Sequence, residues 1–330
     1  MKMITATSPC RIDIGGTWDM GMFALPLQAI NPCTITIALD YKTIVEIDEY
    51  DSGKILLVEN GVETELNSFA LQFIGKNALI NAILSYFCAD GISVRVSKEF
   101  PYQSGLGGSG SLAVCLISAL NKCFSFDLSK TKIVNLAHRI ENDLRISYTG
   151  FQDQCAAMYG GVRMWQWIIN NDYWKSSLQL LNPADYFDLE ERLIISYIGK
   201  GHDGNIVNQK QIDSFLDGSK RNVWLAINRN TRICADAFAK EKWDSIAYCI
   251  TFEHENRTDI VPERLTGNSK KYEAVAKLFG QGFGVAGSGG TVFYLAKDRF
   301  DAMEVKAAWS QIDGCEILDS KISYAGTMVE

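Results

Sequence analysis

The feature that most constrains the fold is a strand-like segment that runs through a glycine-rich loop into an apolar helix. In residues 91–100, Ile92, Val94 and Val96 alternate with polar side chains. This period of two predicts a strand with one buried face and one face in water. Residues 109–123, which come directly after the loop, are strongly apolar and predict a buried helix.

Similar patterns predict the other elements. Strands are expected over residues 3–14, 34–49, 54–58, 62–66, 162–169, 177–181, 193–198, 292–296 and 316–322. Helices are expected over residues 69–88, from a cap at Asp127 or Ser129 to 145, and over 205–216, 219–239, 242–255 and 299–311. Asn60-Gly61 predicts a hairpin because this pair readily adopts positive φ. These patterns predict mixed or antiparallel sheets with helices on one face.

The chain is long enough for about two domains, since it has 330 residues. Its character changes near Asn182-Pro183, after which polar helices become frequent. We therefore expect an α+β fold with an N-terminal domain over residues 1–185 and a C-terminal domain over residues 186–330.

The composition excludes several functional classes. The chain is 47% hydrophobic and 22% charged, as is ordinary for a globular protein, and its net charge is −7. An acidic chain is a poor general nucleic-acid binder, because that role needs a basic surface. The nine cysteines form no Cys-x-x-Cys pair, which predicts free thiols in a reducing cytoplasm. We find neither a signal peptide nor a run of about 18 apolar residues, so we expect a cytoplasmic protein with no membrane partner.

The loop over residues 101–111 has the properties of a phosphate-binding site. Its sequence is Pro-Tyr-Gln-Ser-Gly-Leu-Gly-Gly-Ser-Gly-Ser. Clustered glycines let backbone N–H groups approach a ligand closely, and the next helix adds unpaired donors and a positive dipole end. The hydroxyls of Ser104, Ser109 and Ser111 are further ligands for phosphate or Mg²⁺.

Two other interpretations of this loop stay open at this point, and one is excluded. Gly105-x-Gly107-x-x-Gly110 matches a dinucleotide-binding fingerprint, with Asp127 near the later acidic position. The alternation in residues 92–96 argues against it, because a Rossmann first strand is continuously apolar. A plain glycine-rich turn is the other possibility. A Walker A loop is excluded, because the glycines are not succeeded by Gly-Lys-Ser/Thr.

Three ordered motifs resemble those of the GHMP kinases, the superfamily of galactokinase, homoserine kinase, mevalonate kinase and phosphomevalonate kinase. The loop resembles the family's ATP-binding Gly-Leu-Gly-Ser-Ser-Ala, with Gly108 and Gly110 in place of a serine and the alanine. Residues 9–19, Pro-Cys-Arg-Ile-Asp-Ile-Gly-Gly-Thr-Trp-Asp, resemble the opening motif of the sugar kinases. Residues 284–291, Gly-Val-Ala-Gly-Ser-Gly-Gly-Thr, resemble the third motif, a glycine loop that supports the nucleotide loop.

A fourth segment places the resemblance nearest the D-glycero-D-manno-heptose 7-phosphate kinase and L-fucokinase branch. Residues 149–157, Thr-Gly-Phe-Gln-Asp-Gln-Cys-Ala-Ala, are similar to the catalytic segment of those kinases. The resemblance implies a two-domain GHMP kinase fold. Its N-terminal domain is expected to be ribosomal protein S5 domain 2-like, and its C-terminal domain ferredoxin-like with extra helices.

The resemblance also implies an activity and a set of site residues. The expected reaction transfers the γ-phosphate of ATP to the anomeric hydroxyl of a sugar or sugar phosphate, with heptose 7-phosphate as first choice. By resemblance, Asp153 is the catalytic aspartate, Arg11 stabilises the γ-phosphate, and Ser109 and Glu141 hold Mg²⁺. The expected ATP-binding residues are Pro101, Ser104, Gly105, Leu106, Gly107, Gly108, Ser109, Gly110 and Ser111. The expected sugar-binding residues are Asp13, Thr17, Asp19, Gly150, Gln152, His202, Gly287, Ser288 and Gly289.

Each assignment has a structural alternative. Asp153 could cap a loop, Arg11 could be a surface strand residue, and Glu141 could lie on a solvated helix face. Lys200 and His202 stand near the place where the family carries an Arg-Ser pair, and could bind a distal phosphate less rigidly than a bidentate arginine. The aromatic run Trp165, Trp167, Tyr173 and Trp174 is more typical of packing than of a ligand platform.

Other functions also stay open. They are an L-fucokinase or galactokinase-like enzyme, a GHMP kinase for a non-sugar alcohol, and a catalytically silent sensor of sugar and ATP. A monomer or a homodimer is expected.

Overall fold

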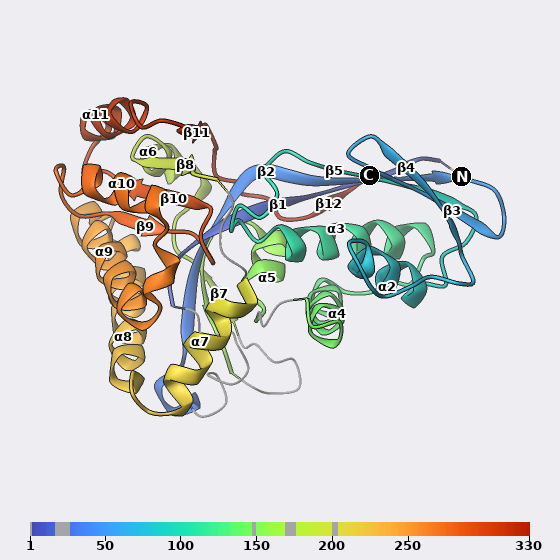
Figure 1. The fold of residues 1–330 in the computed structure, drawn as a ribbon, viewed down its shortest axis with the longest axis horizontal. Helices are drawn as coiled ribbons and strands as arrows, with labels where there is room; N and C mark the ends of the chain where they lie inside the picture. The colour runs from blue at the N-terminus through green and yellow to red at the C-terminus, as the bar shows by residue number, and fades with distance from the viewer. Residues whose placement is uncertain (1, 17–26, 147–149, 169–175, 200–203) are drawn as a thin grey trace.

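The strands in the described part of the chain form two sheets (Figure 1). The computed structural model describes residues 2–16, 27–146, 150–168, 176–199 and 204–330. The larger sheet contains β1 (Ile4–Gly15), β2 (Cys33–Glu49), β3 (Lys54–Glu59), β4 (Val62–Asn67), β5 (Ile92–Lys98), β6 (Val162–Gln166), β7 (Ser176–Gln179) and β12 (Met328–Val329). Its order is β12-β1-β2-β5-β3-β4, with β6 beside β2 and β7 beside β6. Only the β3–β5 pairing of these strands is parallel, so the expected mixed sheet is confirmed.

The local patterns explain the strands at the centre of this sheet. In β5, Val94 and Val96 are buried while Arg95 and Ser97 are exposed, as their alternation predicts. The β3–β4 hairpin turns at Asn60 and Gly61 with φ values of 52° and 77°, the conformation that Asn-Gly favours.

Four helices cover one face of the larger sheet (Figure 1). They are α2 (Ala78–Tyr86), α3 (Gly108–Cys123), α4 (Lys130–Asp143) and α5 (Gln152–Tyr159). Helix α3 is central, because its apolar residues are almost all buried and it packs on β1 and β2. Ser129, rather than Asp127, caps α4, and its hydroxyl accepts a hydrogen bond from the Lys132 amide at 3.4 Å.

The smaller sheet has the strand order of a ferredoxin-like domain. It contains β8 (Leu193–Tyr197), β9 (Phe283–Val285), β10 (Thr291–Leu295) and β11 (Glu316–Leu318). Its antiparallel order β11-β8-β10-β9 is 4-1-3-2 in chain order. The helices of this half are α6 (Tyr186–Glu190), α7 (Gly204–Leu216), α8 (Arg221–Phe238), α9 (Trp243–Ile260), α10 (Gly267–Ala276) and α11 (Arg299–Trp309). Short 3₁₀ turns occupy Gln28–Ile30, Pro183–Asp185 and Pro262–Arg264. The predicted two-domain α+β fold is confirmed.

Several predicted boundaries are wrong. The helix expected over residues 69–88 begins only at Ala78, because Gly75 adopts φ of 75° and leaves Phe69 and Ile74 exposed in a loop. Strand β9 overlaps the start of the glycine loop expected over residues 284–291, and the strand expected over residues 316–322 stops at Leu318. Neither α5 nor α10 was predicted.

The C-terminus returns to the first sheet. Strand β12 pairs with β1 through Ala6 and Thr7, although the other strands of that sheet precede residue 180. The domain boundary at residue 185 stays a prediction. In the ranges that the structure describes, no helix is long and apolar enough to cross a membrane.

Candidate active site

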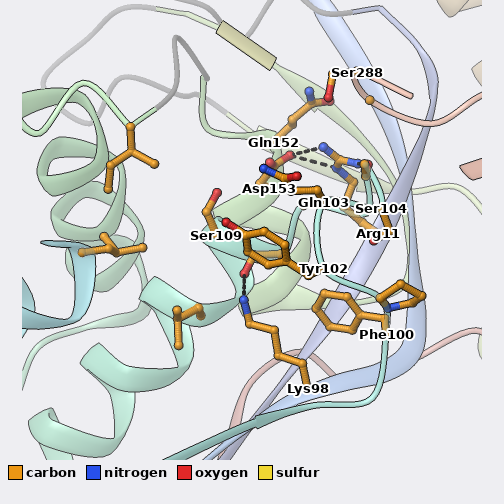
Figure 2. Close-up of a pocket in the computed structure, with 18 of the residues that line it drawn as sticks. Arg11, Lys98, Phe100, Tyr102, Gln103, Ser104, Ser109, Gln152, Asp153 and Ser288 are labelled. Atoms are coloured by element: carbon orange, nitrogen blue, oxygen red, sulfur yellow. Dashed lines mark hydrogen bonds and ion pairs between the residues drawn. The ribbon is translucent and has the colours of Figure 1, made fainter. Parts of the chain in front are cut away.

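A cavity of about 450 Å³ opens where the two halves of the chain meet (Figure 2). Its wall is formed by the glycine loop after β5, the start of α5, Arg11 of β1, and Gly287 and Ser288 of the β9–β10 turn. Among the predicted site residues, the lining includes Arg11, Pro101, Ser104, Gly105, Gly107, Gly108, Ser109, Gly150, Gln152, Asp153, Gly287 and Ser288. Residues that are far apart in the sequence therefore share one cavity.

The glycine loop leads into a helix whose start has no side-chain cap among the described residues. Gly105 and Gly107 have φ values of 79° and 73°, which L side chains rarely adopt. Helix α3 begins at Gly108, and its N-cap Gly107 has no side chain to pair with the first-turn N–H groups. Such a terminus is a ready site for phosphate.

Three residues that were predicted to bind ATP stabilise the glycine loop and do not line the cavity. The Ser111 hydroxyl bonds to the Ser8 carbonyl at 3.1 Å and to the Thr43 hydroxyl at 2.9 Å, in the core. Leu106 is buried, and its carbonyl accepts a bond from the Arg11 amide at 3.0 Å. A Cβ on Gly110 would lie 2.6 Å from that of Asp153, so glycine is needed for α3 and α5 to pack this closely.

Arg11 and Asp153 form a buried ion pair beside the glycine loop. The Arg11 Nε and Nη2 atoms donate to Asp153 Oδ1 at 2.8 and 2.6 Å, and Nη1 donates to the Gly105 carbonyl at 2.7 Å. The two residues are only 4% and 6% exposed. Arg11 is thus not a surface strand residue, and Asp153 lies in the first turn of α5.

Glu141 of α4 is buried near Ser109, which lines the cavity, whereas Glu141 itself is not among the lining residues. Burial raises the pKa of Glu141 to about 7, and the neighbouring Ser109 side chain opposes this shift. Gln154 donates to Glu141 Oε2, while Oε1 is buried without a hydrogen-bond partner among the described residues. A carboxylate oxygen left unpaired beside a hydroxyl fits Mg²⁺, which prefers oxygen ligands. The expected metal-binding residues therefore fit the ion.

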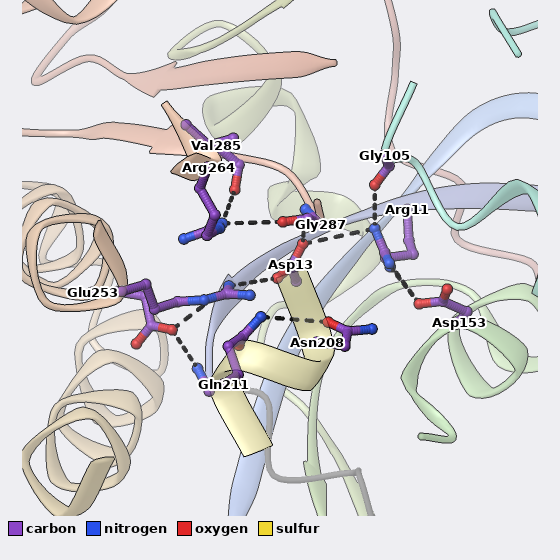
Figure 3. Close-up of polar contacts among 12 residues, drawn as sticks. Arg11, Asp13, Gly105, Asp153, Asn208, Gln211, Glu253, Arg264, Val285 and Gly287 are labelled. Atoms are coloured by element: carbon purple, nitrogen blue, oxygen red, sulfur yellow. Dashed lines mark hydrogen bonds and ion pairs between the residues drawn. The ribbon is translucent and has the colours of Figure 1, made fainter. Parts of the chain in front are cut away.

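Asp13 joins the two halves of the chain (Figure 3). Its Oδ1 accepts a bond from the Gly287 amide at 2.7 Å, and its Oδ2 accepts one from Arg257 Nη1 at 2.8 Å. Burial would raise the pKa of Asp13, but the guanidinium groups of Arg257 and Arg11 hold it well below its usual range. Asp13 is 2% exposed and is absent from the cavity lining.

The β9–β10 turn is held from the other side by Arg264. This buried side chain donates to the carbonyls of Val285 at 3.0 Å and Gly287 at 3.1 Å. The turn packs directly on the nucleotide loop, since a Cβ on Gly105 would lie 2.4 Å from the Gly289 carbonyl oxygen. The two glycine motifs therefore touch backbone to backbone.

Not every predicted residue can be placed, and some important residues were missed. Thr17, Asp19, Lys200 and His202 lie outside the described residues, as do Tyr173 and Trp174. Trp165 and Trp167 are packing residues. Both are buried, and their indole N–H groups donate to the hydroxyls of Thr36 and Thr34.

No local pattern pointed to Arg257 and Asn208, which also line the cavity. All nine cysteines are free.

Comparisons with known proteins identify a matching family and similar sequences. Residues 73–161, which include the glycine loop, Glu141 and Asp153, match the family "GHMP kinases N terminal domain". The chain is 26% identical over 176 residues to a mevalonate kinase from Pyrococcus abyssi, a match that covers 48% of the chain and half of that relative. It is 22% identical over 258 residues to the D-glycero-alpha-D-manno-heptose 7-phosphate kinase of Campylobacter jejuni, which covers 75% of each.

Solved structures share the fold over the whole chain. A D-glycero-D-manno-heptose 1-phosphate kinase from Bacteriodes thetaiotaomicron superposes with a TM-score of 0.77 and 19% identity, covering 99% of this chain and 98% of that one. The two-domain architecture is therefore that of the GHMP kinases.

Proposed function

The chain has a GHMP kinase N-terminal domain and the two-domain GHMP kinase fold, and we propose that it is an ATP-dependent sugar kinase. The observation that carries the proposal is the buried Arg11–Asp153 pair, which faces the cavity beside an uncapped helix terminus. Phosphoryl transfer needs a bound triphosphate, compensation for its charge and an aligned nucleophile, and this cavity has a candidate group for each.

The glycine loop binds the phosphates in this proposal. Backbone N–H groups at the start of α3 donate to phosphate oxygens, because no side chain caps them. Ser109 and Glu141 would hold Mg²⁺, and the ion would offset the negative charge of the phosphates.

Asp153 receives the proton of the acceptor hydroxyl. Both Arg11 bonds go to Oδ1, which leaves Oδ2 as the atom that takes the proton. Arg11 fixes the orientation of this carboxylate, and its charge stabilises the transferred phosphoryl group. Because Arg11 also bonds to the Gly105 carbonyl, it couples the proton acceptor to the nucleotide loop.

We propose the anomeric hydroxyl as the acceptor, with heptose 7-phosphate first and L-fucose or a galactose-like sugar second. The match to a heptose 7-phosphate kinase over 75% of both chains supports this order. Matches to mevalonate kinases, one at 26% identity over 48% of the chain and one at 21% over 99% of it, keep a non-sugar alcohol as the alternative.

A product assay tests the proposal. The protein is incubated with ATP and Mg²⁺ and with heptose 7-phosphate, L-fucose, D-galactose or mevalonate, and the products are analysed by phosphorus NMR. The expected product is acid-labile and shows phosphorus coupling to the C1 proton. A new phosphate on a primary hydroxyl, with C1 still reducing, would overturn the anomeric assignment. Binding of sugar and ATP without any product would instead indicate a sensor.

A further inference from the structure

Lys98 ends strand β5 on the buried face of the sheet. Val94 and Val96 precede it at intervals of two and are buried, whereas Arg95 and Ser97 point to solvent. Lys98 continues the buried series at the point where the strand enters the glycine loop. A lysine is rarely placed on a buried face unless its charge is used.

The ammonium group of Lys98 lies at the start of helix α3. Its Nζ atom donates to the Gly108 carbonyl at 3.3 Å, and the side chain lines the cavity below the loop (Figure 2). Burial lowers the pKa of Lys98, and only the more distant carboxylates of Glu59 and Glu141 oppose this shift.

No carboxylate in the described ranges forms an ion pair with Lys98. Glu59 pairs instead with Lys76 at 3.1 Å, and Glu141 is bonded to Gln154. The acceptor that Lys98 does have is a neutral carbonyl, and an ammonium group has two further N–H donors for another acceptor.

A bound anion would stabilise the charge of Lys98 at this position. The N-terminus of a helix carries a partial positive charge, so a lysine beside it meets a charge of the same sign. An anion between the two is attracted to both. The helix terminus and the half-buried lysine therefore both favour a negatively charged ligand at the same place.

We propose that Lys98 binds a phosphate group of the nucleotide. On binding, its ammonium group exchanges the Gly108 carbonyl for a phosphate oxygen, which gives a charge-assisted hydrogen bond. The lysine that a Walker A loop carries after its glycines is supplied here from the strand before the loop. This inference rests on the proposed function, since it assumes that the cavity binds ATP.

Calorimetric titration of the full chain with ATP, ADP and adenosine tests the inference. For Lys98→Met we expect ATP affinity to fall about 10–100-fold, the loss of one hydrogen bond to a charged group, while adenosine affinity stays unchanged. Lys98→Arg should recover much of the ATP affinity, because it restores the charge. Arg95→Met is the matched control, as it removes a cation from the exposed face of the same strand and should leave ATP affinity unchanged.

The outcomes separate the two proposals. Wild-type ATP affinity in a folded Lys98→Met protein would overturn the role of Lys98, and so would an equal loss for adenosine. If Lys98→Met does not fold, Lys98→Gln keeps a polar side chain without the charge and is judged by the same criteria. Failure of the wild-type protein to bind ATP would overturn the proposed function itself.

Discussion

The two glycine-rich segments of the molecule look alike in sequence but lead into different elements. The loop after β5 leads into α3, a helix of 16 residues, and so presents unpaired N–H groups to the cavity. The turn between β9 and β10 connects two antiparallel strands, so it does not lead into a helix. It is fixed by Asp13 and Arg264 and packs its backbone on Gly105. The first segment is thus suited to binding and the second to support.

The glycines of both segments also make room for protein atoms. A Cβ on Gly287 would lie 2.7 Å from the Gly105 carbonyl oxygen, and one on Gly108 would lie 2.9 Å from the Phe100 ring. The glycines of these motifs therefore allow close packing of protein atoms as well as the approach of a ligand. The departure at Gly110 is consistent with this, since a Cβ there would lie 2.6 Å from Asp153 Cβ.

The largest effect is expected for Gly107→Val in the binding loop. A Cβ at this position would lie 3.2 Å from Asp153 Cγ and 3.3 Å from Arg11 Cγ, at a φ of 73°. We expect ATP binding to be abolished, because the side chain blocks the approach of phosphate and displaces the ion pair. Calorimetric titration with ATP measures this.

Gly53→Val is the matched control, since Gly53 has φ of 81° and no atom of the described residues lies within 4 Å of its Cβ position. Both variants should lose about 1–3 kcal/mol of stability from the left-handed backbone. Only Gly107→Val should lose ATP. Intact ATP affinity in that variant would remove the binding role from the first loop.

The next effect is expected for Asp153→Asn, in the first turn of α5 beside the binding loop. The substitution is nearly isosteric and removes the charge and basicity of the carboxylate. We expect a normal fold and a kcat about 10²–10⁴-fold lower, as for loss of a positioned proton acceptor. Steady-state kinetics measure this, with Asp143→Asn as an exposed control. A near-wild-type kcat would exclude Asp153 from the reaction.

A smaller effect is expected for Arg264→Met, which tests the supporting segment. The change leaves the buried carbonyls of Val285 and Gly287 without their donor. We expect about 1–3 kcal/mol of lost unfolding free energy, measured in urea. Arg264→Lys should lose less. If Arg264→Met abolishes ATP binding while stability is unchanged, the second segment has a direct binding role and the comparison fails.

The smallest effect is expected for Ser288→Ala, which removes the one hydroxyl that the second segment adds to the cavity lining, as far as the described residues show. Loss of a neutral hydrogen bond to the acceptor sugar predicts an increase in its KM of about 2–10-fold. An unchanged KM for the acceptor would show that the turn contributes its backbone alone.

Local patterns predicted those parts of the fold in which neighbouring residues decide the structure. The predictions for β5 and the Asn60-Gly61 turn are confirmed, because sheet faces and tight turns depend on adjacent side chains. The pattern failed over residues 69–77, where apolar residues suggested a helix and the chain forms an exposed loop. It also missed α5, whose small residues are buried by contacts with α3 rather than by an amphipathic pattern.

The sequence alone determined the order of the glycine motifs, the strand–loop–helix unit and the residue types available for phosphoryl transfer, since each is a local property of the chain. Only the tertiary structure decided which of these residues meet. Arg11 and Asp153 are 142 positions apart, and Asp13 and Gly287 are 274 apart. Spacing over such distances carries no information about contact, because the folding of the intervening chain brings the groups together. Burial then converts these encounters into a fixed ion pair and a fixed turn, by excluding the water that would otherwise compete for their hydrogen bonds.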